Sequence, residues 1–247
     1  MSNGRILVSP EDSLSLRVIS LFLSIDGEVT ARGQGCPAFF IRLAGCNLRC
    51  WQDLGGCDTT YSFGAGEEMR VSTLLERVTA SGCPRVTLTG GEPLLQQGPA
   101  LTALLRGLAQ RHISVSVETN GSQPPDFPGR ELVNCLVYDY KCPSSGCESA
   151  MLPFEHMYAG LAPSDYIKFV IADESDYRCA RAKALQAREL ARQRPGPRLA
   201  FSSFLPALPA GLTPPRLVAR LLEDGLFEVQ FNLQIHKFIW PDAETDI

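Results

Sequence analysis

The sequence predicts an α/β fold in which parallel strands and intervening helices curl into a barrel-like unit. After residue 66, strand-like and helix-like segments alternate along the chain, which is the pattern of βαβ units. Several strand segments alternate apolar and polar residues, whereas a parallel sheet with helices on both faces has continuous apolar runs. Polar residues also gather at the ends of these segments, where parallel barrels carry their functional groups.

The predicted helices lie near residues 70–81, 98–112, 175–194 and 213–224. The predicted strands lie near 38–43, 85–89, 113–119, 133–141, 166–172, 198–204 and 227–236. Residues 142–165 have turn formers at both ends and are expected to form a long loop. Residues 1–16 are expected to be a polar, weakly ordered leader, and residues 17–247 a single domain.

Strand periodicity carries the barrel prediction. In residues 227–236, Phe227, Val229, Phe231, Leu233 and Ile235 alternate with Glu228, Gln230, Asn232, Gln234 and His236. Residues 85–89 and 113–119 alternate in the same way. Because side chains alternate across a strand, we expect one face against helices and a polar face toward a lumen. An antiparallel sheet with one solvated face is the alternative, which the helix-length connections disfavour.

Composition narrows the class of protein. At 247 residues and 45% hydrophobic, the chain is long enough for one barrel-sized unit. The sequence contains no run of eighteen apolar residues, so no membrane span is predicted. Nine cysteines without the spacing of a small secreted scaffold predict reduced thiols and a cytoplasmic location. A net charge of −4 does not favour nucleic-acid binding.

Three cysteines lie close together in GCNLRCWQDLGGCDTTY, residues 45–61. Thiolates from one loop, here Cys46, Cys50 and Cys57, can converge on one soft ion or cluster. Three ligands on a four-iron cluster leave one iron open to a further ligand. A structural zinc site with a histidine as fourth ligand is the alternative, but the TGGEP sequence at 89–93 has no role in it. The paired glycines of TGGEP allow the backbone to approach a ligand closely.

These motifs together resemble one enzyme family. The cysteine loop, TGGEP, VETNG (117–121), DYKCPSSG (139–146), IKFVI (167–171) and LQIHKFIW (233–240) are similar to those of the 7-carboxy-7-deazaguanine synthases, a branch of the radical S-adenosylmethionine enzymes. The resemblance covers residues 22–240. It implies a partial (β/α)6-type barrel, usually homodimeric, that holds a [4Fe-4S] cluster, S-adenosylmethionine and Mg²⁺. The implied reaction contracts the ring of 6-carboxy-5,6,7,8-tetrahydropterin to give 7-carboxy-7-deazaguanine and ammonia, a step toward queuosine.

The resemblance also assigns roles to residues. Cys46, Cys50 and Cys57 would be the cluster ligands. The residues near S-adenosylmethionine would be Gly56, Cys57, Asp58, Gly91, Asp139, Tyr140 and Lys141, and Thr59 would ligate Mg²⁺. The pterin would be held by Ile25, Asp26, Gly27, Arg42 and Thr89. Arg42 suits a carboxylate and Glu118 a guanidine-like edge, while Gln234 and His236 would share a strand face and close the pocket. An ion pair between Glu118 and Lys168 is the alternative.

Two departures from the family pattern stand out. The cysteine spacing is C-x3-C-x6-C instead of C-x3-C-x2-C, a lengthening with a small closure cost. The usual Gln-Gly-Glu-Gly run reads Asp26-Gly27-Glu28-Val29. Aspartate does not donate a hydrogen bond as glutamine does, so the pterin oxygen would need another donor.

A basic stretch covers residues 178–198, with Arg178, Arg181, Lys183, Arg188, Arg192, Arg194 and Arg198 against Glu189. This pattern is typical of a solvated helix face, and it could also form a docking surface for an acidic, flavodoxin-like electron donor. Two further functional classes are compatible with the cysteine loop. Another radical S-adenosylmethionine enzyme, such as a glycyl-radical activase, would often carry additional ferredoxin-like cysteine motifs, and none is visible. The other is a zinc-stabilised binding module.

Overall fold

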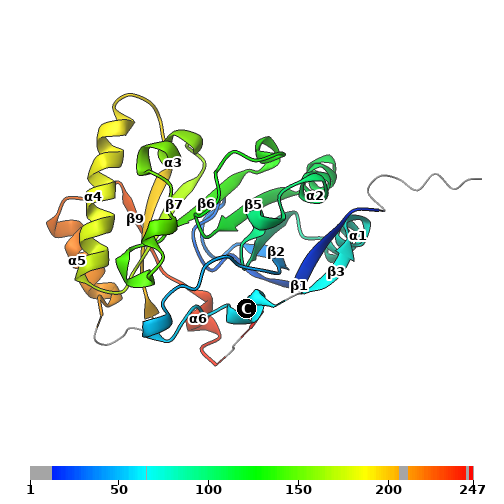
Figure 1. The fold of residues 1–247 in the computed structure, drawn as a ribbon, viewed down its shortest axis with the longest axis horizontal. Helices are drawn as coiled ribbons and strands as arrows, with labels where there is room; N and C mark the ends of the chain where they lie inside the picture. Colours follow the sequence, from blue (N-terminus) through cyan, green and yellow to red (C-terminus); the bar gives the residue numbers. More distant parts are fainter. Residues whose placement is uncertain (1–12, 65, 206–210, 243–244, 247) are drawn as a thin grey trace, which may run out of the picture.

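A computed structural model describes residues 13–64, 66–205, 211–242 and 245–246 and shows one continuous sheet with helices packed against it (Figure 1). The strands are β1 (Ser15–Ile25), β2 (Pro37–Leu43), β3 (Glu67–Arg70), β4 (Arg85–Gly90), β5 (Ser114–Thr119), β6 (Cys135–Tyr140), β7 (Tyr166–Ile171), β8 (Arg198–Ser203) and β9 (Val229–Asn232). The α-helices are α1 (Val71–Ser81), α2 (Pro99–Gln110), α3 (Phe154–Gly160), α4 (Glu174–Ala191), α5 (Pro214–Glu223) and α6 (His236–Ile239).

The described strands run in the order β3-β1-β2-β4-β5-β6-β7-β8-β9. From β2 through β4 to β9 every pairing is parallel, while β1 is antiparallel to both β2 and β3. Strands β3 and β9 end the sheet, so it remains an open barrel. The predicted α/β class and partial barrel are confirmed. Among the described strands, the parallel part consists of β2 and β4 to β9, one strand more than the six-stranded barrel that the resemblance implies.

One face of the sheet is apolar and covered by helices. Val86, Leu88, Val115 and Val117 are buried in the main core, where they join Leu104 and its neighbours on the helices. The opposite face carries Thr87, Ser116 and Lys168, which are buried polar groups. In Figure 1, α1 and α2 lie beside the half of the sheet that contains β1 to β5, and α3 to α5 beside the other half. The two-faced strands are therefore confirmed.

The four predicted helices are present, but the structure also contains β1 and β3, which were not predicted. Strand β1 begins at Ser15, and Leu16 is buried, so the end of the expected leader belongs to the sheet. Residues 1–12 lie outside the described part of the chain. The expected loop 142–165 contains α3, whose Phe154 and Met157 are buried in the core.

The predicted strand 227–236 is largely wrong. Only Val229–Asn232 forms β9, and Phe227 is 80% exposed instead of packing on a helix. After Asn232 the chain turns out of the sheet, because the Ile235 amide donates to the Gly27 carbonyl at 3.0 Å. Gln234 therefore lies in a loop and His236 begins α6, so they do not share a strand face.

No helix in the described ranges combines the length and the apolar character needed to cross a bilayer.

Candidate active site

A cavity of about 210 Å³ lies where the parallel strands β2, β4, β5, β6 and β7 end. Its walls come from the cysteine loop, from the strand ends and from residues 234–237. In Figure 1 the cysteine loop and α6 lie at the same end of the molecule. The carboxyl ends of parallel strands are where α/β barrels place their functional groups. Fifteen predicted residues line this cavity: Ile25, Gly27, Arg42, Cys46, Cys50, Cys57, Asp58, Thr59, Thr89, Gly91, Glu118, Asp139, Lys141, Gln234 and His236.

The lengthened cysteine loop folds back on itself. Trp51 adopts the left-handed conformation with φ of 55°, and its carbonyl accepts from the amides of Leu54 at 2.9 Å and Gly56 at 2.7 Å. Residues 52–55 therefore form a closed, exposed turn. The amide of Trp51 donates to the Ser145 carbonyl at 2.9 Å, which ties the loop to the segment after β6. The extra residues thus leave Cys57 at the cavity.

The three sulfur atoms lie in different surroundings. Cys46 accepts from Asn120 Nδ2 at 3.5 Å, and Cys57 Sγ lies 3.2 Å from Thr59 Oγ1. Burial raises the pKa of Cys50 to about 12, so a thiolate there needs an adjacent cation. Within the described ranges, no three His, Cys, Asp or Glu side chains converge as ligands of one metal ion. The three thiols share one cavity, and their donor chemistry fits an iron–sulfur cluster.

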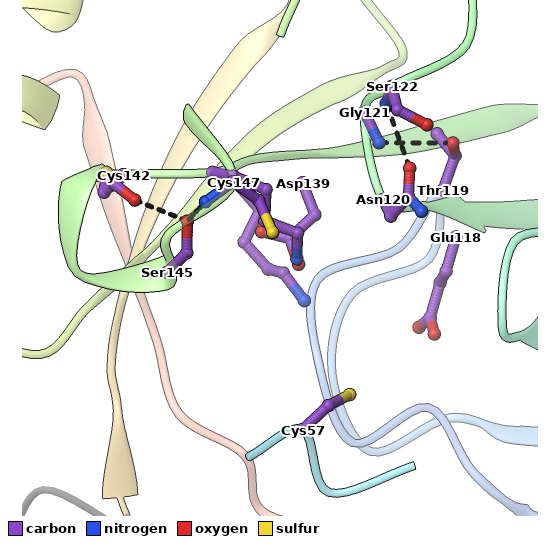
Figure 2. Close-up of polar contacts among 12 residues, drawn as sticks. Cys57, Glu118, Thr119, Asn120, Gly121, Ser122, Asp139, Cys142, Ser145 and Cys147 are labelled. Carbon is purple, nitrogen blue, oxygen red and sulfur yellow. Dashed lines mark hydrogen bonds and ion pairs between the residues drawn. The ribbon is translucent and has the colours of Figure 1, made fainter. Parts of the chain in front are cut away.

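Figure 2 shows Cys57 and Glu118 approaching the same space from different segments, with Asp139 on a third side. Asp139 accepts from Lys141 Nζ at 2.6 Å, and the Lys141 ammonium lies 4.8 Å from the centre of the Trp51 ring. The second carboxylate oxygen of Asp139, Oδ1, is buried without a hydrogen-bond partner. A buried acceptor that lacks a partner is costly, and a bound ligand with an N–H or O–H group would satisfy it.

The TGGEP segment packs directly against the cysteine loop. The Gly91 amide donates to Leu43, and the Glu92 amide donates to the Gly45 carbonyl at 2.8 Å. A Cβ atom at Gly91 would lie 2.0 Å from that carbonyl oxygen, so only glycine fits. The Glu92 carboxylate is buried and accepts from the Asn120 amide at 2.6 Å and the Leu94 amide at 2.8 Å. Glu92 thereby joins the ends of β4 and β5.

Two residues predicted near S-adenosylmethionine do not line the cavity. The Tyr140 ring is buried in the core, 5.3 Å from the Phe169 ring and 6.2 Å from the Phe154 ring, centre to centre. Side chains alternate along β6, so Tyr140 points opposite to its neighbour Asp139. Gly56 belongs to the turn that closes on Trp51.

Arg42 has the features of an anion-binding group. Its guanidinium lies 5.4 Å from the ring centres of both Phe22 and Tyr61, and the residue is 8% exposed. Its Nε atom is buried and has no hydrogen-bond partner, although Asp246 Oδ1 lies 3.5 Å away. A desolvated guanidinium held in one orientation suits bidentate recognition of a carboxylate.

Glu118 is a buried carboxyl group of the cavity lining whose pKa departs from its ordinary value. It accepts from Thr89 Oγ1 at 2.7 Å. Burial raises the pKa of Glu118 to about 7, with a further contribution from the negative charge of Glu28, while Lys168 opposes the rise. A ligand that brings hydrogen-bond donors or positive charge would therefore stabilise the ionised form of Glu118.

Lys168 pairs with Glu28 and not with Glu118, so the alternative ion pair is wrong. Glu28 also accepts from Gln234 Nε2 at 2.7 Å and Asn232 Nδ2 at 3.3 Å. Burial alone would raise the pKa of Glu28, but the charge and hydrogen bond of Lys168 lower it to about 2. Both residues line the cavity. Glu28 was not among the predicted site residues, although its place directly after the predicted site residue Gly27 was a usable signal.

Asp26, predicted to contact the pterin, has a structural position. Its carboxylate is 4% exposed and accepts from Thr87 Oγ1 at 2.7 Å and Thr30 Oγ1 at 3.3 Å, outside the cavity lining. Gly27, in contrast, lines the cavity, and a Cβ atom there would lie 1.8 Å from Nδ1 of His236. Asp26 thus braces the loop after β1 on β4, while Gly27 leaves room for the histidine ring.

Comparison with known proteins identifies relatives along nearly the whole chain. A family model described as a 4Fe-4S single cluster domain matches residues 31–137. The 7-carboxy-7-deazaguanine synthase of Chlorobaculum tepidum is 35% identical over 230 residues, which cover 92% of this chain and 96% of that protein. The corresponding synthase of Koribacter versatilis is 34% identical over 242 residues, covering 91% and 97%.

A solved structure agrees in fold. The crystal structure of QueE from Escherichia coli superposes with a TM-score of 0.63 at 19% sequence identity, covering 89% of this chain and 93% of that one. Since identity, coverage and fold point the same way, the chain belongs to the 7-carboxy-7-deazaguanine synthase family.

Proposed function

We propose that this chain is a radical S-adenosylmethionine lyase that converts 6-carboxy-5,6,7,8-tetrahydropterin to 7-carboxy-7-deazaguanine with release of ammonia. The observation that carries the proposal is one cavity that holds three cysteines, a buried guanidinium and a buried carboxyl group. Family membership supplies the reaction, and the cavity supplies groups of the chemistry that it needs. The product would feed the biosynthesis of queuosine or a related deazapurine.

Cys46, Cys50 and Cys57 would hold the [4Fe-4S] cluster, and Asp139, Lys141, Asp58 and the backbone at Gly91 would border S-adenosylmethionine. When bound, this pair supplies the one-electron chemistry that starts the rearrangement. The unpartnered Asp139 Oδ1 provides an acceptor for a ligand N–H or O–H group. Lys141 holds the other oxygen of Asp139, which fixes the direction of that acceptor.

The substrate would lie between Arg42 and Glu118. Arg42 would bind the pterin carboxylate, and Glu118, oriented by Thr89, would accept hydrogen bonds from the guanidine-like edge. Glu28 and Lys168 would fix Gln234 at the rim, since Gln234 donates to Glu28. The Gly27 backbone and the His236 ring pack against each other and would exclude water from this side.

Thr59 is the proposed ligand of Mg²⁺. It lines the cavity beside Cys57 and follows Asp58, which also lines it. Mg²⁺ prefers oxygen ligands and keeps several waters, so one protein hydroxyl with substrate oxygens is a suitable set. Turnover that is lost with a chelator and restored by Mg²⁺ in the parent, but not in Thr59→Val, would support this ligand.

A flavodoxin-like protein is the proposed electron donor, but residues 178–198 are a poor place for it. Arg181 pairs with Asp224 at 2.9 Å, and Arg188 pairs with Glu228 at 2.8 Å. Helix α4 begins just after the end of β7 that faces the cavity, and at about 1.5 Å per residue Arg188 lies about 20 Å further along the helix. Arg192→Glu is therefore expected to leave flavodoxin-supported turnover unchanged.

A cytoplasmic location and a homodimer complete the proposal. Sedimentation of the purified protein at several concentrations tests the dimer.

The decisive experiment is anaerobic reconstitution with iron and sulfide, followed by incubation with S-adenosylmethionine, a reductant and the carboxy-tetrahydropterin. We expect about four irons per chain and formation of the deazaguanine acid. Cys57→Ala should lower the iron content, whereas the matched variant Cys83→Ala, outside the cavity lining, should retain iron and turnover. Iron without product would favour an activase-like enzyme, and a colourless zinc-containing protein would favour a binding module; both results would overturn the proposal.

A further inference from the structure

Asn120, on the loop after β5, carries a buried amide group beside one of the proposed cluster ligands. Its Nδ2 atom donates to the Cys46 sulfur at 3.5 Å and to Asn47 Oδ1 at 3.0 Å. The residue is 9% exposed and lines the cavity. None of the cofactor and substrate contacts proposed above uses this amide group.

Hydrogen bonds fix which end of the Asn120 amide faces the sulfur. Its Oδ1 atom accepts from the Ser122 backbone amide at 3.0 Å, a bond that only the oxygen can make. Figure 2 shows this bond between Ser122 and the oxygen of Asn120. The nitrogen then points the other way, where its two N–H groups meet Asn47 Oδ1 and the Cys46 sulfur. A flipped amide would leave the Ser122 N–H without its acceptor, so the sulfur faces a donor.

The backbone on both sides of this contact is held by one residue, Glu92. Its amide donates to the carbonyl of Gly45, directly before Cys46, at 2.8 Å, and its carboxylate accepts from the Asn120 amide at 2.6 Å. Cys46 also packs closely on the TGGEP segment, since a Cβ atom at Gly91 would lie 3.0 Å from the Cys46 Cβ atom. Glu92 is fully buried, so these bonds are shielded from water. The separation of Cys46 and Asn120 is therefore set by the scaffold.

We propose that Asn120 is a positioning residue that raises the reduction potential of the iron–sulfur cluster through its hydrogen bond to Cys46. The inference rests on the proposed function, because it requires Cys46 to be a cluster ligand. Reduction adds one negative charge to the cluster and its thiolates, and an N–H group directed at a ligand sulfur stabilises that charge. The step is the entry of one electron from an external reductant, and no covalent bond forms or breaks.

The surroundings of the pair favour a measurable effect. Asn120 is buried, and Cys46 packs against the apolar cluster that contains Leu48 and Trp51. A hydrogen bond to a charged partner is stronger where water is excluded. Because the chain's own residues fix the direction of the Asn120 amide, the donor does not have to reorient when the electron arrives.

The test is a redox titration of anaerobically reconstituted protein without S-adenosylmethionine, followed by electron paramagnetic resonance. Asn120→Leu removes both N–H groups, so the equilibrium constant for one-electron reduction should fall roughly tenfold, which is a shift of about 59 mV to more negative potential. Asn120→Asp keeps an acceptor for the Ser122 amide, places a carboxylate beside the sulfur and should shift the potential further in the same direction. Ser122→Ala, a change in the same loop that keeps the backbone bond to Asn120, should have the parental potential.

Iron content and S-adenosylmethionine binding separate the possible failures. A parent protein that binds no iron would refute the proposed function itself, whereas parent and variants that each load about four irons at one common potential would overturn the role of Asn120 alone. An unchanged potential with weaker calorimetric binding of S-adenosylmethionine to Asn120→Leu would also overturn it, because the amide would then act on the cofactor directly. If Asn120→Leu and Asn120→Asp both fail to load iron while Ser122→Ala loads it, Asn120 is a structural residue and the proposal is wrong.

Discussion

Replacing Glu118 by glutamine should make the protein more stable and less active. The pKa of Glu118 is raised from an ordinary value of 4.5 to about 7, chiefly by burial. A carboxyl group whose pKa is higher in the folded state favours folding when it is protonated. Its contribution is therefore fully present below pH 4.5 and is lost as the pH rises through 7. Glutamine keeps an acceptor for Thr89 and removes the titration.

The size of the effect follows from the shift. About 2.5 units at 1.36 kcal/mol per unit give about 3 kcal/mol over the whole range, of which about 2.5 kcal/mol falls between pH 5 and pH 8. Activity should change in the opposite direction, because the substrate would lose a charge-assisted hydrogen bond. Such a bond contributes about 1.5–3 kcal/mol, so kcat/KM should fall roughly 10- to 100-fold.

Urea unfolding of the reduced, cofactor-free protein from pH 5 to pH 8 measures the first effect. The free energy of unfolding of the parent should decline relative to that of Glu118→Gln as the pH rises. Glu131→Gln, a change at an exposed glutamate, should follow the parent. Parallel curves for the parent and Glu118→Gln would refute the buried, neutral carboxyl group, and an unchanged kcat/KM would refute its contact with substrate.

Two further substitutions test the packing of the cavity. Lys168→Met leaves Glu28 buried without its cation and should lower the free energy of unfolding at pH 7, measured in urea, by about 3–5 kcal/mol. The double variant Lys168→Met/Glu28→Gln should recover most of that loss. An unchanged urea midpoint for Lys168→Met alone would contradict the pairing of Lys168 with Glu28. Gly91→Ala places a Cβ atom 2.0 Å from the Gly45 carbonyl oxygen, so the cysteine loop must shift. Iron bound after reconstitution should fall in Gly91→Ala and stay at the parental level in Gly64→Ala, where φ is −64° and the nearest atom to the added carbon is the Tyr61 carbonyl oxygen at 3.7 Å.

Local sequence patterns predicted side-chain orientation correctly where the alternation within a single strand determines it. In β5, Val115 and Val117 are buried in the core, while Glu118 lines the cavity. The same rule failed after Asn232, although the alternation continues through His236. A hydrogen bond from Ile235 to Gly27 draws the chain out of the sheet there, and no local pattern encodes that contact.

Strand β1 was not predicted from the sequence, for a related reason. It is an antiparallel strand added beside β2 at one edge of a parallel sheet, so the βαβ alternation does not predict it. Its sequence, SLRVISLFLSI, mixes buried, half-buried and exposed positions without a clean period of two. Tyr140 was misplaced because a motif match covers three consecutive residues, whereas alternate side chains of a strand point to opposite faces.

By itself the sequence determined which residue types meet at this site: the thiols of one loop, the paired glycines, the arginine before the loop and the carboxyl group at the end of β5. These follow from short motifs and from strand period, which are local properties of the chain. Only the tertiary structure decided which charged and polar side chains pair with one another. Lys168 is neutralised by Glu28, 140 residues away, and Asp26 is turned onto Thr87 instead of toward the cavity. The physical reason is that a buried charge takes the partner that folding brings within reach, and that choice depends on how distant strands and loops stack.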